Sequence, residues 1–388
     1  MHIIKCFFLV AFSVLTTSFS SGQQYTRIDL PGLLKPERDP NLSEIANSLE
    51  FIKLQTHSDH LLGTIRGVAS WGNQLLIQAN GGKSLFVFDR KGNFIKEVGK
   101  RGKGPGEFLE IYGLTVDPKT NHIYLLDNGQ VKVVEFCEKG DFVAEKKLGF
   151  YATGILKLDQ GFLFYTGSVY SYRTEGCLLT KTDDSYNVIN RFHKRPSNRG
   201  IPDRVRTLYF HDKNVCYWEP YWDTVYTFTG SSFEPKYFFD LGRNRIPQKY
   251  LESHNTMDYD LNPYVWLGGF KEFESFIYFD FIDKNKRGKK LFYNKLNKTG
   301  YSIPGSLQFM NWGFVNDFLG GSLFSLDYKL SANEVCCSYE VADLKEYLAK
   351  GVFARYKANN QLMHDNFIKL IKDSKIEDNP ILIIVKLK

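Results

Sequence analysis

The segment 102–108 (GKGPGEF) combines alternating glycines with positive charge, and these residue types can bind an anion. Backbone amides next to glycine can surround a phosphate, but known phosphate loops have other glycine spacings and lead into a helix. Segment 102–108 has neither that spacing nor a helical pattern after it. We therefore expect a tight connection in which Glu107 caps backbone amides. An anion contact through Arg101 and Lys103 is the alternative.

Two further patterns contain residue types that bind metal ions. His57 and His60 have an aspartate between them and could form a metal pair, although loop histidines are more often ordinary surface residues. The segment 283–288 (DKNKRG) is similar to the start of a calcium loop, but Arg287 stands where a ligand belongs and Asn294 replaces the terminal glutamate. We interpret it as a polar hairpin turn. The sequence therefore predicts no metal site and no cofactor.

Motifs of common hydrolases are absent from the sequence. It contains neither Gly-x-Ser-x-Gly nor His-Glu-x-x-His. A catalytic pair of carboxylates could come from distant segments, but no pair stands out.

Aromatic residues are the best remaining candidates for ligand contact. Such rings stack on sugars or flat ligands and contribute to protein interfaces, while packing inside the fold is the alternative. Polar residues before expected inner strands could point at a central channel. The candidates for ligand contact are Trp218, Trp222, Trp266, Trp312, Arg66, Asn316 and Asp317.

A repeated unit between residues 68 and 142 must position these side chains. Val68 corresponds to Val116 and Phe88 to Phe136, an offset of 48 residues. The first copy contains four short strand-like runs joined by tight turns, at residues 67–69, 75–78, 85–88 and 94–98. Four strands per unit at a fixed period of this length are typical of the blade of a β-propeller.

Looser copies follow, with room for an insertion at residues 243–263. They lie within residues 150–195, 203–242 and 264–304, and a sixth begins near 314–324. Two helical patterns, at 343–350 and 362–372, interrupt the sixth copy.

An apolar run at residues 381–387 ends the chain and needs burial in a sheet. A strand at 49–54, or a nearby segment, is expected to complete its blade, because pairing the two ends closes a circular array. The sequence thus predicts an all-β, six-bladed β-propeller of four-stranded antiparallel blades at residues 49–388. We expect a short helical insertion in the last blade at about 342–375, and an irregular N-terminal arm at 23–48.

Residues 1–22 are expected to be a signal peptide. A lysine precedes an apolar run at 6–15 that is too short to span a bilayer, and the small residues Ser20 and Gly22 precede the expected cleavage point. Cys6 is the first residue of the apolar run, whereas a lipid-anchoring cysteine would follow it. We expect export to the periplasm or the cell surface, without a lipoprotein anchor.

Composition excludes several partners. Among 388 residues, 15% are aromatic and the formal net charge is only +7, with acids and bases interspersed, so nucleic-acid binding is not expected. No other segment is long and apolar enough for a transmembrane helix. Cys137, Cys177 and Cys216 are expected to be buried free thiols, while the pairing of Cys336 and Cys337 is open. A monomer is expected.

Four segments carry a resemblance to a known family. They are 85–94 (LFVFDRKGNF), the glycine-rich segment 102–108, Asp317 with Gly320 and Gly321, and 377–382 (EDNPIL). Over nearly all of the chain beyond residue 22, the sequence resembles the six-bladed β-propellers, similar to NHL-type propellers, that are abundant among the exported proteins of one large group of Gram-negative bacteria. The resemblance implies the propeller fold and export. Most members of that family have no assigned activity, so it implies little about function.

These observations favour an exported, non-catalytic binding module. Its ligand would be a glycan, a peptide or a protein partner, held at the channel mouth or by the loops on one face. The alternative is a hydrolase or lyase with a site at the central channel. An enzyme should show polar groups with perturbed pKa values converging on the channel, whereas a binding module should show an aromatic or apolar rim. The irregular half of the chain is where we expect the site.

Overall fold

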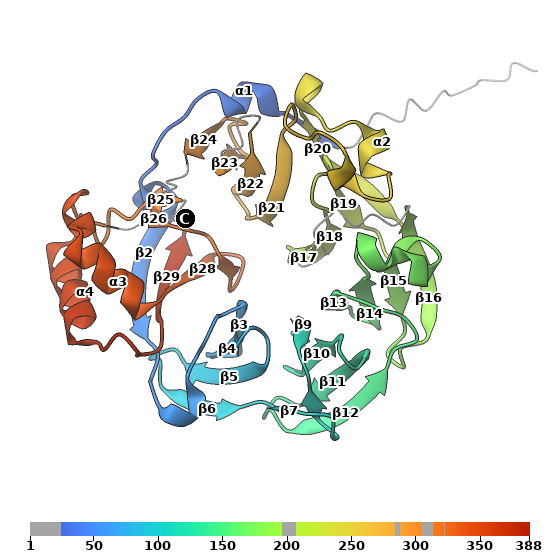
Figure 1. Ribbon diagram of the computed structural model, residues 1–388, viewed down its shortest axis with the longest axis horizontal. Coiled ribbons are helices and arrows are strands. Elements are labelled where there is room, and N and C mark those ends of the chain that lie inside the picture. Colours follow the sequence, from blue (N-terminus) through green and yellow to red (C-terminus); the bar gives the residue numbers. More distant parts are fainter. Residues whose placement is uncertain (1–24, 196–206, 284–287, 305–312, 322) are drawn as a thin grey trace, which may run out of the picture.

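The computed structural model describes residues 25–195, 207–283, 288–304, 313–321 and 323–388. In this part of the chain, six sheets are arranged radially around a central axis (Figure 1), and each contains four antiparallel strands. The predicted six-bladed β-propeller is therefore confirmed. Its core lies between neighbouring blades, where the apolar faces of adjacent sheets pack together.

Blades one to three follow the predicted repeat closely. From the axis outward, blade one contains β3 (Gly67–Trp71), β4 (Gln74–Ala79), β5 (Ser84–Asp89) and β6 (Phe94–Glu97). Blade two contains β9 (Ile111–Val116), β10 (Ile123–Asp127), β11 (Lys132–Phe136) and β12 (Phe142–Lys147). Blade three contains β13 (Gly154–Lys157), β14 (Phe162–Tyr165), β15 (Cys177–Thr182) and β16 (Val188–Lys194).

Turn chemistry explains why the repeat folds in this register. In blade one, Asp89 Oδ1 accepts hydrogen bonds from the backbone N–H groups of Lys91 and Asn93, both at 2.8 Å. Gly92 has φ +89°, and a Cβ atom there would lie 2.3 Å from the Lys53 carbonyl oxygen. Only glycine fits this position, so the sequence around residue 92 fixes the turn between the third and fourth strands.

Blades four to six are less regular. Blade four contains β17 (Leu208–His211), β18 (Asn214–Tyr217), β19 (Thr224–Phe228) and β20 (Phe233–Asp240). Blade five contains β21 (Trp266–Glu272), β22 (Phe276–Ile282), β23 (Gly288–Asn294) and β24 (Gly300–Pro304). Blade six contains β27 (Tyr328–Lys329), β28 (Glu334–Tyr339), β29 (Ile381–Leu387) and β2 (Ala46–Lys53).

Blade six joins the two ends of the propeller. β2 pairs antiparallel with β29, with Leu49 opposite Val385 and Ile52 opposite Leu382. This is the ring closure predicted from the two apolar runs. It removes the open sheet edges that an unclosed array would expose.

The arm before β2 is not irregular as expected. β1 (Thr26–Asp29) adds to β20 as a parallel fifth strand of blade four, and α1 (Leu30–Leu34) follows at the outside of blades four and five (Figure 1). β1 and α1 bury only two apolar residues, Ile28 and Leu30, which are too few to show a period in the sequence. From blade four the arm runs past blade five to blade six.

The segment 314–324 does not begin blade six, contrary to the prediction. β25 (Phe314–Val315) and β26 (Leu323–Phe324) form a separate two-stranded hairpin, and the inner strand of blade six is β27. A two-residue inner strand leaves no periodic signal in the sequence, so the more apolar hairpin was mistaken for it.

The helical insertion lies between β28 and β29. α3 (Val341–Ala349) and α4 (Gln361–Asp373) pack on the outside of blade six, where Leu344 and Phe367 join its core. Gly351, with φ +66°, follows α3 and allows the chain to turn away, as predicted. No helix in the described part of the chain is long and apolar enough to cross a membrane.

Candidate functional site

The loops that connect the strands lie on two opposite faces of the ring. Because neighbouring strands are antiparallel, connections from one blade to the next share a face with the turns between second and third strands. We call this the upper face. The turns between first and second strands, and between third and fourth strands, lie on the opposite, lower face.

The glycine-rich loop on the upper face is a structural connector. β7 (Lys100–Arg101) pairs with β8 (Glu107–Phe108), and Glu107 Oε2 accepts a hydrogen bond from the Gly104 N–H at 2.7 Å. This is the expected cap. A Cβ atom on Gly102 would lie 1.9 Å from the same carboxylate oxygen, so the glycine is required by close packing. The buried Asp127 also accepts a hydrogen bond from the Leu109 N–H at 2.9 Å.

Arg101 and Lys103 are exposed at this loop. Neither side chain forms an ion pair with another residue that the structure describes. Their contact with an anion stays a prediction.

Arg66 is neutralised by a neighbouring blade. Its Nη1 atom lies 2.5 Å from Glu110 Oε1, which ties the start of blade one to the start of blade two. Both side chains are about two-thirds buried. Arg66 therefore lies at the upper face with its charge already paired, and its contact with a ligand stays a prediction.

Asn316 and Asp317 are structural rather than channel-facing. Both side chains are buried in the β25–β26 hairpin. Asp317 accepts hydrogen bonds from the Ser43 N–H at 3.0 Å, the Ser43 hydroxyl at 2.5 Å and the Asn359 side-chain amide at 2.6 Å. It thus joins the hairpin to the arm and to the helical insertion, which corrects the expectation that it points at the channel. Trp312 lies outside the described residues.

Trp218 is a core residue. Its side chain is 1% exposed, and its indole N–H donates to the Trp222 carbonyl oxygen at 2.9 Å. A ligand cannot reach this ring, so Trp218 does not remain among the candidate contacts. Trp222 is also largely buried, with the Arg195 guanidinium 3.3 Å from its ring centroid. Trp266 is partly exposed and donates its indole N–H to the Leu261 carbonyl oxygen at 2.8 Å.

Residues 242–265 connect blade four to blade five on the upper face and form a cap. The cap contains η4 (Gly242–Asn244), α2 (Gln248–Leu251) and η5 (Thr256–Asp258), and it occupies the insertion expected at 243–263. Ile246, Leu251 and Leu261 give it a small apolar core that includes Trp222. The cap is therefore anchored on blade four by Trp222.

An aromatic surface covers the cap. Tyr250 and Tyr259 stack with ring centroids 4.2 Å apart and planes 14° apart, and Tyr264 meets Tyr250 edge-on at 6.1 Å. Tyr259 is 39% exposed and Met257 is 51% exposed. Stacking holds the tyrosine rings in fixed orientations, so little side-chain entropy would be lost when a partner binds there.

A buried polar cluster lies on the lower face, where blades four, five and six meet. Glu272, at the end of β21, is 1% exposed. Its carboxylate accepts hydrogen bonds from four side chains and lies 3.1 Å from His211 Nε2. The donors are Tyr237 at 2.7 Å, Lys236 at 2.9 Å, Tyr209 at 3.0 Å and Lys295 at 3.1 Å. Lys329 Nζ also donates to the Glu272 carbonyl oxygen at 2.8 Å.

Burial and charge set the protonation states in this cluster. Burial alone would raise the pKa of Glu272, but the Lys236 and Lys295 ammonium groups outweigh it and hold that pKa below its usual value. Burial lowers the pKa of His211 to about 4. Glu272 is therefore charged and His211 neutral near pH 7. The hydrogen bonds of the carboxylate are all used within the fold, which makes the cluster a lock between blades.

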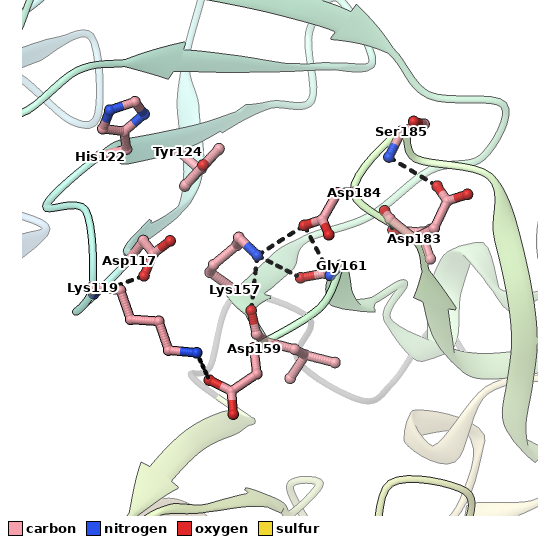
Figure 2. A network of polar contacts seen from close by, with 12 residues as sticks. Asp117, Lys119, His122, Tyr124, Lys157, Asp159, Gly161, Asp183, Asp184 and Ser185 are labelled. Atoms are coloured by element: carbon pink, nitrogen blue, oxygen red, sulfur yellow. Dashed lines mark hydrogen bonds and ion pairs between the residues drawn. The ribbon is translucent and has the colours of Figure 1, made fainter.

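Figure 2 shows a second polar network, on the lower face of blades two and three. The buried Lys157 places Nζ 2.9 Å from Asp184 Oδ1 and 2.8 Å from the Leu158 carbonyl oxygen. Lys119 and Asp159, 2.9 Å apart, join blade two to blade three at the surface. Each cation in this network is paired, so it connects turns and offers no free catalytic group. In the described residues, no group of three or more His, Cys, Asp and Glu side chains is placed to hold a metal ion.

A cavity lies elsewhere, on the lower face beside the arm. It has a volume of about 740 Å³ and is lined by residues of the arm, blade five and the end of β29. A second cavity of about 380 Å³ lies between β2 and α4. Neither cavity has Glu272 in its lining.

Residues 25–386 match the family model described as a domain of unknown function, DUF4934. The chain belongs to the DUF4934 family. No curated protein matches it. Its fold is similar to that of a Bacteroides fragilis protein described as a candidate exported protein, with TM-score 0.73 and 23% identity over 94% of this chain and 99% of that one. A member of the DUF4221 family from Bacteroides vulgatus has TM-score 0.49 and 9% identity, over 88% of this chain and 97% of that one.

The family match accounts for the scaffold of this DUF4934 protein and leaves its ligand open. The resemblance to exported bacterial propellers is confirmed as far as the six-bladed fold, and the NHL-like character of the repeat stays a prediction. Two sites were missed by the sequence analysis, the Glu272 cluster and the cavity beside the arm. Their residues come from four or more separate segments, and no local pattern could have brought them together.

Proposed function

We propose that this DUF4934 protein is an exported, non-catalytic binding module, and that the aromatic surface of its cap recognises a glycan, a peptide or a protein partner. Export to the periplasm or cell surface is supported by the signal-like pattern in residues 1–22. The similar fold of a Bacteroides fragilis protein described as a candidate exported protein agrees with it. We expect the mature protein to be a monomer without a lipid anchor.

The observation that carries the proposal is the stacked pair Tyr250–Tyr259 beside the exposed Met257. The cap is an addition to the blade repeat, so the propeller does not need these rings for closure. Rigid tyrosines with exposed faces, next to a flexible methionine, are typical of contact surfaces for sugars, peptides and proteins.

A hydrolase or lyase receives no support from a specific observation. The strongest convergence of polar groups with perturbed pKa values is the Glu272 cluster, and its carboxylate is buried and fully hydrogen-bonded. A catalytic carboxylate must reach a substrate.

A glycan array and a peptide array probed with residues 23–388 would test the proposal. We expect one ligand class to bind, and Tyr259→Ala to weaken its dissociation constant about tenfold, because one exposed aromatic contact is lost. Tyr172→Ala is the matched control, since Tyr172 is a 62% exposed tyrosine outside the cap. Two empty arrays, or equal losses in the two variants, would contradict binding at the cap.

A further inference from the structure

The cavity beside the arm has the size of a small-molecule site. Its volume of about 740 Å³ falls within the usual range of roughly 300–1,000 Å³ for such pockets. It opens on the lower face, on the opposite side of the ring from the connections that form the cap. A ligand in this cavity would therefore be independent of the cap.

The arm makes the wall of the cavity by bridging two blades. The Ser302 N–H donates to the Pro36 carbonyl oxygen at 2.8 Å, and the Arg38 N–H donates to the Ser302 carbonyl oxygen at 3.1 Å. After this contact with β24 the arm continues to β2 in blade six. It crosses the gap between blades five and six at the point where the cavity lies, so the wall is held at both ends.

Aromatic rings form the inner wall. Phe276 and Phe292 pack with centroids 4.9 Å apart, and Tyr301 stacks on Phe292 at 5.1 Å. The guanidinium of Arg38 covers Tyr301 at 4.4 Å from the ring centroid and pairs with Glu44. Tyr301 therefore has Phe292 and Arg38 against it and leaves no free face on which a sugar ring could stack.

Two opposite charges at the rim are free of protein partners. Glu274 and Lys388 both line the cavity, and neither side chain forms an ion pair or side-chain hydrogen bond with any residue in the described ranges. Glu44 and Arg38 satisfy each other. The cavity thus offers one free side-chain anion and one free side-chain cation at its rim.

We propose that this cavity binds a short peptide with free ends. The ligand ammonium would pair with Glu274, the ligand carboxylate would pair with the Lys388 ammonium, and the body of the ligand would fill the cavity between them. A neutral sugar would leave both charges unpaired and would find no open ring face. A ligand with a single charge would use only one of the two free groups.

Isothermal titration of residues 23–388 with the tripeptide Ala-Leu-Ala tests this inference. The free tripeptide should bind, and its N-acetylated or C-amidated form should bind about fivefold to tenfold more weakly, as expected for loss of one partly exposed charged contact. Maltose serves as the neutral competitor and should not displace the tripeptide. Absence of binding by the tripeptide, equal affinity for the blocked forms, or displacement by maltose would overturn the proposal.

Two variants assign the ends of the ligand. Glu274→Gln should abolish the preference for a free ammonium and retain the preference for a free carboxylate, and Lys388→Met should do the reverse. Both positions are exposed, so the fold should tolerate the changes, and unchanged melting temperatures would check this. Tyr259→Ala should leave the tripeptide affinity unaltered, which separates this site from the cap. If either variant retains or loses both preferences together, the assignment of the two ligand ends is refuted.

Discussion

Glu272→Gln should destabilise the propeller severely, although the substitution only replaces one carboxylate oxygen by an NH2 group. The amide keeps the volume of the side chain, but its single oxygen can accept from only one of Tyr209 and Tyr237, whose hydroxyl groups donate to different oxygens of the carboxylate. It removes the negative charge that Lys236 and Lys295 contact at 2.9 and 3.1 Å. Two ammonium groups are then left without a counterion at the junction of blades four and five.

The size of the loss follows from how deeply the charges lie. Removing one partner of a buried ion pair costs about 3–5 kcal/mol, because the remaining charge stays uncompensated. The Lys236 and Lys295 side chains are 21% and 18% exposed and can turn partly toward water. We therefore expect the lower end, about 3 kcal/mol, in the free energy of unfolding at pH 7.

Urea unfolding followed by tryptophan fluorescence would measure this loss. The double variant Glu272→Gln/Lys236→Met should recover part of it, because one of the two orphaned ammonium groups is removed. Asp159→Asn is the matched control: its carboxylate also pairs with a lysine, but at the surface, and no measurable change is expected. A loss below about 1 kcal/mol for Glu272→Gln would refute the view that the cluster locks the blades together.

Two further changes probe the lower and upper faces. Because burial lowers the pKa of His211 from 6.5 to about 4, the unfolded chain binds a proton that the folded chain does not between these values. The free energy of unfolding should therefore fall as the pH drops through this window. Urea titrations at several pH values would measure this slope, and His211→Gln should flatten it. An unaltered slope in the variant would exclude His211 as its source. Gly102→Ala places a methyl group on the Glu107 carboxylate and should cost about 1–3 kcal/mol, whereas adding Glu107→Ala should remove the clash. If the double variant is no more stable than Gly102→Ala, steric contact with Glu107 is not the cause.

The regular blades were readable from sequence because each local feature agrees with the fold. Around Asp89 and Gly92, side-chain hydrogen bonds and a positive φ specify the turn, and the neighbouring strands are long enough to show their apolar pattern. Ring closure was readable because 49–54 and 381–387 were two strands without partners. In contrast, β1 and β27 are four and two residues long, and their places are set by tertiary contacts alone.

The candidate site was readable only in outline. The excess length between blades four and five indicated an insertion, and one of its tyrosines, Tyr259, is exposed. Individual residues were less predictable, because the sequence around Trp218 and Trp222 does not distinguish a buried aromatic ring from an exposed one. The two rings are buried because the segment after β18 packs against blade five and the cap. The role of Asp317 likewise depends on a hydrogen-bond partner, Ser43, that is distant in the chain.

The positions of the added elements give a physical reason to look for binding in blades four to six. β1, the cap, the β25–β26 hairpin and helices α3 and α4 all join these three blades, while blades one and two keep the plain repeat (Figure 1). A plain blade already buries its faces against its neighbours, so these additions are not needed to complete the ring. The arm does stabilise the ring, but its route also creates the cavity that carries Glu274 and Lys388, and the cap carries rings that no blade requires. Both proposed surfaces therefore arise where segments were added to a ring that could close without them.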